Sequence, residues 1–138
     1  VVGIAVFLVT TMFTDIPVYN MWLVILITFL TSFLFSTAGF INAVYAKSFD
    51  DINIVTTFVL TPLTYLGGTF YSIDALPQVW QDISVFNPIA YIISSYRLAF
   101  LGLEETSLVL SLSIIVVLII ILFFVALMIL SKGIGIKN

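Results

Sequence analysis

Hydroxyl side chains recur on one side of a long uncharged stretch, residues 52–73. Spacings of three and four residues put three threonines and a glycine on one helix face, with two tyrosines nearby. The residues of this polar face are Thr57, Thr61, Thr64, Tyr65, Gly68 and Tyr71. Pro62 lies in the middle of the stretch, and the hydroxyls can satisfy backbone carbonyls that a proline leaves free. The same face can instead border a polar route through a helical bundle, and the residue pattern leaves both interpretations open.

Three charged positions could also carry function. Asp50 and Asp51 stand directly before this stretch, where a carboxylate can cap a helix by accepting hydrogen bonds from its first amide groups. Arg97 lies in an otherwise apolar segment, where an arginine is costly unless it is paired or reaches the interface. Its candidate partners are Asp82, Glu104 and Glu105. A structural clamp is the favoured role, and direct contact with a substrate is the alternative.

The residue types that are missing exclude several kinds of chemistry. The chain has no cysteine and no histidine, which removes disulfides, thiolate nucleophiles, the usual zinc sites and haem ligation by histidine. The long uncharged stretches contain hydroxyls but no base to activate them and no carboxylate to bind H⁺ or Na⁺, which disfavours an intramembrane enzyme or an ion-driven carrier. The four basic residues are scattered singly, so nucleic acid is not an expected partner. We therefore predict no metal and no cofactor in this chain.

The composition indicates the environment in which these residues lie. Hydrophobic residues make up 62% of the chain and charged residues 8%, against roughly 45–50% and about 25% in soluble domains. Residues 16–46, 52–73 and 106–131 carry no charge, and each run exceeds the roughly 20 helical residues that cross a hydrocarbon core. The sequence therefore predicts an all-α, polytopic membrane protein surrounded by membrane lipids.

Turn residues divide the chain into helical elements. Residues 1–14 are apolar but too short to span, so we interpret them as the end of a helix that begins earlier in a longer protein. A signal peptide is the weaker alternative, because no basic region precedes the run. Spanning helices are expected over residues 20–46, 52–71 and 106–131, with Pro62 kinking or locally unwinding the second.

Between the last two spanning helices the pattern changes to short helices. The first, residues 74–84, alternates apolar and polar positions as an interfacial helix does. Asn87 followed by Pro88 predicts the start of the second, with Asn as N-cap, and Gly102 is suited to end it. The uncharged run inside residues 74–101 is too short to span, which favours a pair of outer or re-entrant helices.

The basic residues predict an orientation. Three crossings place Lys47 and the polar tail, residues 132–138, on the same side, with Arg97 on the other. The side that carries more basic residues faces the cytoplasm in membrane proteins. A cytoplasmic C-terminus is therefore expected.

The spacing of glycine, proline and a few other residues within residues 67–97 resembles a known signature. It reads Gly67-Gly68, then Leu76-Pro77, then Asn87-Pro88-x-x-Tyr91 and, after five residues, Arg97. This spacing is similar to that of ABC-2 type export permeases. The resemblance continues upstream through residues 46–52 and 58–68, where the sequence is particularly similar to a bacterial inner-membrane subgroup of these permeases.

The resemblance implies a fold like that of type V ABC exporters, with six transmembrane helices per subunit and short outer or re-entrant helices between the fifth and sixth. In that scheme the chain holds the end of the third helix (1–14), the fourth (20–46), the fifth (52–71), the outer pair (74–101), the sixth (106–131) and a cytoplasmic tail (132–138). The motif residues Leu76, Pro77, Asn87, Pro88, Tyr91 and Arg97 would form an outer gate.

The resemblance also implies a function. Such permeases form the export path across the bacterial inner membrane, and a separate ATP-binding subunit holds ATP and Mg²⁺. They act as dimers, and we expect a homodimer here, with a heterodimer as the alternative. Phe49, Asp50 and Asp51 would contact the ATP-binding subunit, although simple helix capping explains the two aspartates equally well, and the polar face would border the path. The chain has no phosphate-binding loop of its own. A structural or sensory membrane subunit that transports nothing is the alternative.

Overall fold

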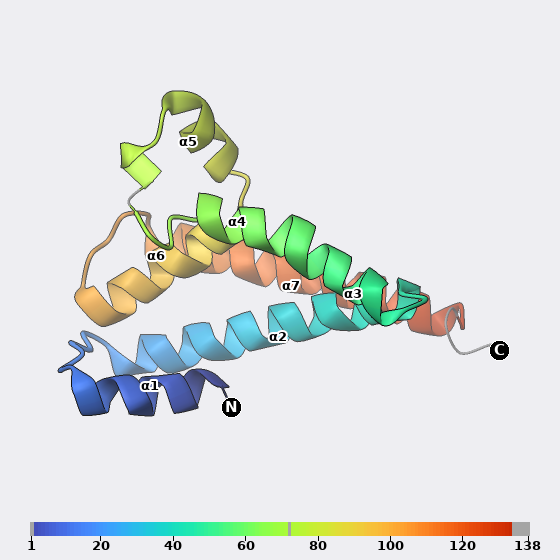
Figure 1. Cartoon of the computed structure of the whole chain (residues 1–138), viewed down its shortest axis with the longest axis horizontal. Helices are drawn as coiled ribbons and strands as arrows, with labels where there is room; N and C mark the ends of the chain where they lie inside the picture. Colours follow the sequence, from blue (N-terminus) through green and yellow to red (C-terminus); the bar gives the residue numbers. More distant parts are fainter. Residues whose placement is uncertain (1, 72, 134–138) are drawn as a thin grey trace.

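In the computed structural model, which describes residues 2–71 and 73–133, every regular element is a helix (Figure 1). The elements are α1 (Val2–Phe13), α2 (Met21–Tyr45), α3 (Phe49–Val55), the π-helical turn η1 (Thr56–Leu60), α4 (Thr61–Leu66), the 3₁₀ turn η2 (Ile73–Ala75), α5 (Gln78–Ser84), α6 (Pro88–Leu101) and α7 (Leu108–Ser131). The predicted all-α class is confirmed.

Among the described residues, α2 and α7 are long and apolar enough to cross a membrane. Their bounds closely match the predicted ranges 20–46 and 106–131. The start of α2 follows from its local sequence, because the side chain of Asn20 accepts a hydrogen bond from the amide of Leu23 at 3.2 Å. The predicted tail, residues 132–138, lies mostly outside the described residues.

The third predicted spanning helix has different bounds. Helical backbone runs without a break from Phe49 to Leu66, about 27 Å at 1.5 Å per residue, whereas the sequence predicts residues 52–71. It starts earlier because Ser48 is the N-cap and forms a capping box with Asp51. It ends earlier because Gly68 takes a φ of 81°, outside the range of a right-handed helix.

The predicted kink at Pro62 takes the form of the π-helical turn η1. The backbone amide of Thr61 bonds to the carbonyl of Thr56, five residues back, and the Thr61 hydroxyl donates to the same oxygen at 3.1 Å. A π turn adds one residue to a helical turn, so Thr56 and not Thr57 lies one turn below Thr61. The predicted polar face assumed α-helical spacing, whereas the π turn pairs Thr61 with Thr56.

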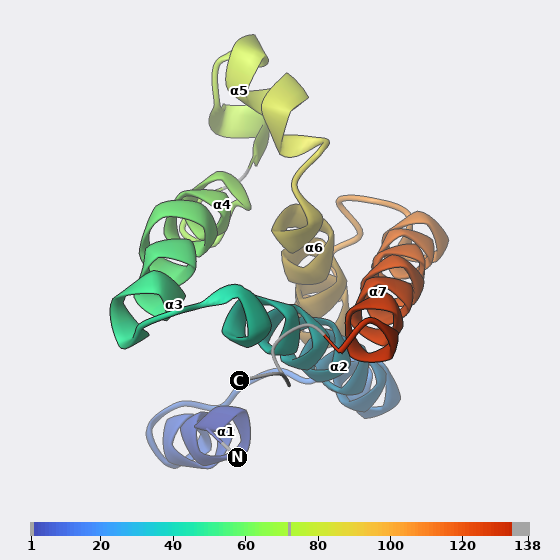
Figure 2. The ribbon, with the colours of Figure 1, turned by 90° about the vertical axis from the view of Figure 1, so that its right-hand side faces the viewer.

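The most enclosed element is α6, which packs against α2, α4 and α7 and lies between the last two in Figure 2. Its buried residues include small side chains at Ala90, Ser94, Ser95 and Ala99, which let neighbouring helices approach closely. The core cluster contains one residue each from α2, α6 and α7, namely Leu34, Ile92 and Ile115. The predicted second short helix therefore forms the centre of the bundle, tied to three neighbours.

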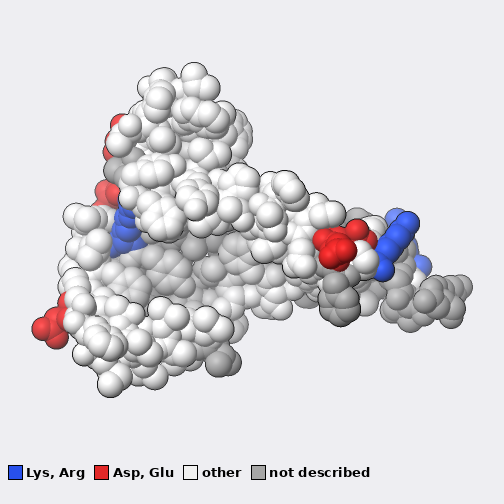
Figure 3. Space-filling model, in the orientation of Figure 1, with Lys and Arg blue, Asp and Glu red and all other residues white. Residues whose placement is uncertain are grey.

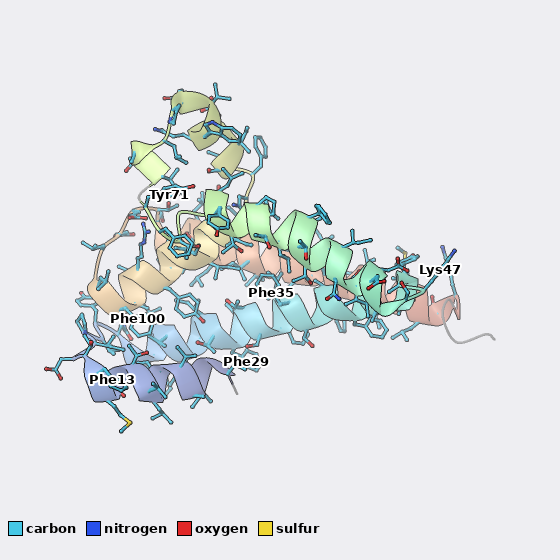
Figure 4. The ribbon with its side chains drawn as sticks, in the orientation of Figure 1. Phe13, Phe29, Phe35, Lys47, Tyr71 and Phe100 are labelled. Carbon is cyan, nitrogen blue, oxygen red and sulfur yellow. The ribbon has the colours of Figure 1, made fainter. Side chains whose placement is uncertain are left out.

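Charged side chains gather at the two ends of the long axis, and the surface between them is uncharged in the view of Figure 3. Lys47 lies at the same end as the last turn of α7, which precedes Lys132 (Figures 1 and 4). The end of α4 and the η2–α5 segment lie toward the opposite end. Lys47 and the end of α7 therefore lie together at one end of the bundle.

Candidate functional site

Polar side chains converge where α4 ends, close to Tyr71 in Figure 4. The last four carbonyls of a helix have no partner within the helix. Here each accepts a hydrogen bond from a side chain. The bonds run from Asn87 Nδ2 to the Leu63 carbonyl (2.6 Å), from Thr69 Oγ1 to Thr64 (2.9 Å), from the Tyr71 hydroxyl to Tyr65 (2.6 Å) and from Ser84 Oγ to Leu66 (3.0 Å). Two of these donors belong to α5 and the N-cap of α6, so the helix end is fastened to the segment that follows it.

These two donors are almost fully buried. Ser84 is 1% exposed and Asn87 2%. The Asn87 side chain also accepts from the amide of Ile89 at 3.0 Å, so it caps α6 while it holds α4. A buried amide that lost its carbonyl partner would leave two polar groups unsatisfied, which makes this contact costly to break.

Arg97, on α6, bonds to two loops as well. One guanidinium nitrogen donates to the carbonyls of Gly68 and Tyr71, the latter at 3.2 Å. The other donates to both carboxylate oxygens of Glu105, at 2.7 and 2.9 Å. Of the three predicted partners the structure selects Glu105, in the loop before α7. We call the set of Ser84, Asn87, Arg97 and Glu105 the clasp.

The paired glycines allow the clasp to close. A Cβ at Gly67 would lie 3.0 Å from Ile89 Cγ2 and 3.1 Å from Ile93 Cδ1, so any larger residue would have to displace these side chains of α6. Gly68 turns the chain through a positive φ and presents its carbonyl to Arg97. The two glycines thus have different physical roles at adjacent positions.

The other motif residues shape the segments that the clasp joins. Pro77 precedes α5, and its carbonyl accepts from the amide of Trp80 at 2.9 Å. The carbonyl of Leu76 accepts from the side chain of Gln81 at 2.8 Å. Pro88 is the first residue of α6, as predicted. The hydroxyl of Tyr91 donates to the carbonyl of Val85 at 2.7 Å and so holds the α5–α6 turn.

The polar-face residues divide between exposed and bonded positions. Thr57 and Tyr65 are exposed, whereas Gly68 is buried under the η2–α5 segment. The hydroxyls of Thr61 and Thr64 donate to backbone carbonyls one turn below, at 3.1 and 2.8 Å. These hydroxyls therefore satisfy backbone carbonyls of the helix, which is the first of the two interpretations of the polar face. Their oxygen lone pairs remain available on the same face.

At the opposite end, Asp51 accepts hydrogen bonds from the amides of Lys47 and Ser48, at 2.9 and 3.0 Å. These bonds, the Lys47 amide foremost, hold the pKa of the Asp51 carboxyl below its ordinary value of 3.8. Asp51 therefore stabilises the turn ahead of the uncharged run, while Asp50 is exposed. The side chain of Phe49 lies outside the described part of the chain.

Sequence reasoning missed three contributors to this geometry. Ser84 and Thr69 donate to α4 carbonyls, and Thr56 replaces Thr57 in the helix register. A serine or threonine in a short segment carries no spacing signal for its tertiary partner. The capping pattern of Ser48 with Asp51 three residues later was readable and locates the helix start.

The arrangement joins helix ends to one another through hydrogen bonds and one ion pair. Within residues 2–71 and 73–133, no three acidic, histidine or cysteine side chains are grouped as metal ligands. The clasp holds α4, α6 and the start of α7 at one end, and one helix leads from it to the polar turn at the other. This geometry defines the class as a helical membrane protein whose bundle is fastened at one end.

Comparison with known proteins identifies the family. The family model described as ABC-2 type transporter matches residues 1–101, and the chain belongs to this family. Over 137 residues it is 44% identical to the "Inner membrane transport permease YadH" of Escherichia coli (strain K12), covering 99% of this chain and 54% of that protein. Over 118 residues it is 28% identical to "Nodulation protein J" of Rhizobium leguminosarum bv. viciae, covering 83% and 46%. The chain spans about half the length of these curated relatives. No solved structure matches it.

Proposed function

We propose that the protein is the permease subunit of an ATP-driven ABC-2 exporter in a bacterial inner membrane. This chain supplies part of the translocation path, a separate ATP-binding subunit hydrolyses ATP with Mg²⁺, and a second permease copy completes the path. Family membership and the name of the Escherichia coli relative support the transport role and the membrane. The chain itself is non-catalytic in this proposal.

The observation that carries the proposal is the clasp. Two residues of the permease signature that are 29 positions apart, Gly68 and Arg97, are bonded to each other at the end of a single long helix. The other end of that helix is the polar turn with Asp50 and Asp51. A displacement of the turn by an ATP-binding subunit is therefore passed along this continuous helix to the clasp, which shifts the bundle between inward-facing and outward-facing states.

The path lies along the exposed side of this helix. Thr61 and Tyr65 are exposed there and Thr64 is half-buried beside them, and the π-turn register adds the exposed Thr56. Hydroxyl oxygens whose donors are already bonded to backbone carbonyls offer lone pairs to a passing polar group without exposing an unsatisfied helix. The η2–α5 segment covers the outer end of the path, and the C-terminus faces the cytoplasm.

The test is cysteine labelling in the full-length permease, co-purified with its proposed ATP-binding subunit and placed in proteoliposomes. With other cysteines removed, Thr61→Cys and Thr64→Cys should react with a membrane-impermeant thiol reagent, and the rate should change when ATP is turned over. Val59→Cys is the matched control, because Val59 is exposed and apolar on the same helix. Equal labelling at residues 59, 61 and 64, unaffected by ATP, would contradict the proposal.

The same preparation separates the structural or sensory alternative. A transport subunit makes the partner's ATP hydrolysis depend on the clasp, so Arg97→Gln should uncouple hydrolysis from transport. A passive anchor leaves hydrolysis unchanged in every variant that still assembles.

A further inference from the structure

A half-open pocket lies beside the clasp, at the end of the molecule where α4 ends. Its volume is about 240 Å³, and it is bordered by the η2–α5 segment, the first half of α6, the loop before α7 and the first turn of α7. The polar residues that line it include Asp74, Gln81, Tyr91, Ser94 and Glu105. We call this space the clasp pocket.

Most hydrogen-bond donors around the clasp pocket are already used. The amide nitrogen of Gln81 donates to the carbonyls of Asp74 and Leu76, at 3.2 and 2.8 Å. The hydroxyl of Tyr91 donates to the carbonyl of Val85. The hydroxyl of Ser84, which also lines the pocket, lies within bonding distance of the Leu66 and Trp80 carbonyls. These side chains have only lone pairs left to offer a ligand.

The charge of the lining favours a cation. Glu105 is paired with Arg97, so the two charges offset each other. Within the described residues Asp74 makes no ion pair, so one negative charge at the pocket is left without a counterion. A ligand that donates hydrogen bonds and carries one positive charge matches both properties.

Ser94 supplies an independent indication that something binds. It lines the pocket, is only 5% exposed, and its hydroxyl has no hydrogen-bond partner among the described residues. A buried polar atom without a partner is unusual in a folded protein and marks a position where a missing group would bond. Its location in the same pocket as Asp74 connects the two observations.

We propose that the clasp pocket binds a primary ammonium group. Such a group has three N–H donors, no lone pair and one positive charge, and the lining offers carboxylate, hydroxyl and amide oxygens as acceptors. The ammonium belongs either to the headgroup of an aminophospholipid or to a soluble amine. The site lies outside the polar face of α4 and does not depend on transport.

The experiment uses full-length permease in nanodiscs of phosphatidylcholine, with ethylammonium as probe and saturation-transfer NMR as readout. Saturable binding is expected. Tetramethylammonium has the same charge but no N–H donor, so it should not displace the probe. Nanodiscs that contain phosphatidylethanolamine distinguish the sources: loss of probe binding identifies the lipid headgroup, and retained binding identifies a soluble amine.

The variants test the assigned residues. Asp74→Asn should weaken ethylammonium binding about tenfold or more, and Ser94→Ala about threefold to tenfold. Asp82→Asn is the matched control, because Asp82 lies on α5, is exposed and does not line the pocket. It should bind the probe as the unmodified protein does. Absence of saturable binding, displacement by tetramethylammonium, or equal effects of Asp74→Asn and Asp82→Asn would overturn the proposal. The helix content of each variant, followed through thermal unfolding, shows that the comparison is between folded proteins.

Discussion

Arg97 offers the sharpest test of the clasp. Replacing it with glutamine removes the ion pair with Glu105 and leaves the carbonyls of Gly68 and Tyr71 without this donor. Hydrogen bonds to a charged group contribute about 1.5–3 kcal/mol each when buried, and exposed ion pairs only about 0–1 kcal/mol. The side chains of Arg97 and Glu105 are 21% and 33% exposed, so each of these bonds contributes less than a fully buried one and more than a fully exposed one. We expect Arg97→Gln to lower the free energy of unfolding by about 2–4 kcal/mol.

The measurement is unfolding of the full-length permease in mixed micelles, followed by loss of helix signal as denaturing detergent is added. Glu105→Gln should cost only about 1 kcal/mol, because the amide oxygen still accepts from the guanidinium. Arg97→Lys should recover part of the loss, since an ammonium keeps the charge but lacks the planar fork that reaches several acceptors. A variant Arg97→Gln as stable as the unmodified protein, yet inactive in transport, would assign Arg97 to the substrate and refute the clasp.

Three further substitutions test the clasp and the turn at the opposite end of the molecule by the same unfolding assay. Gly67→Ala places a Cβ 3.0 Å from an isoleucine of α6 and should cost about 1–3 kcal/mol, whereas Gly39→Ala, with nothing within 4 Å, should cost none. Asn87→Ala removes both a helix cap and a bond to α4 and should cost about 2–3 kcal/mol, while Asn53→Ala, exposed on α3, should stay near neutral. The lowered pKa of Asp51 means that its stabilisation is present above pH 3.8 and is lost as the pH falls below that value. Asp51→Asn should remove this part of the pH dependence, and an unchanged acid profile would show that the capping box contributes nothing.

The local sequence determined the helices and most of their starts. Asn20, Asn87 with Pro88, and Gly102 locate helix ends because a cap depends on side chains within two or three residues. Long uncharged runs determined α2 and α7, since hydropathy and length do not depend on distant partners. Family membership could be inferred from spacing for the same reason, because the signature is a pattern along the chain.

Tertiary structure alone decided which groups meet. Glu105 pairs with Arg97 although Asp82 and Glu104 carry the same charge nearby in sequence, and Glu104 instead accepts from the amide of Leu108 at the start of α7. The carbonyl of Leu63 near the end of α4 is held by Asn87, 24 residues away, and a carbonyl's partner at that separation leaves no periodic trace. The sequence by itself determined that this is a bundle of membrane helices with a proline-interrupted polar face. Only the folded structure decided which threonine lies one turn below Thr61. Only packing decided where the helix is fastened, because that depends on contacts between segments far apart in the chain.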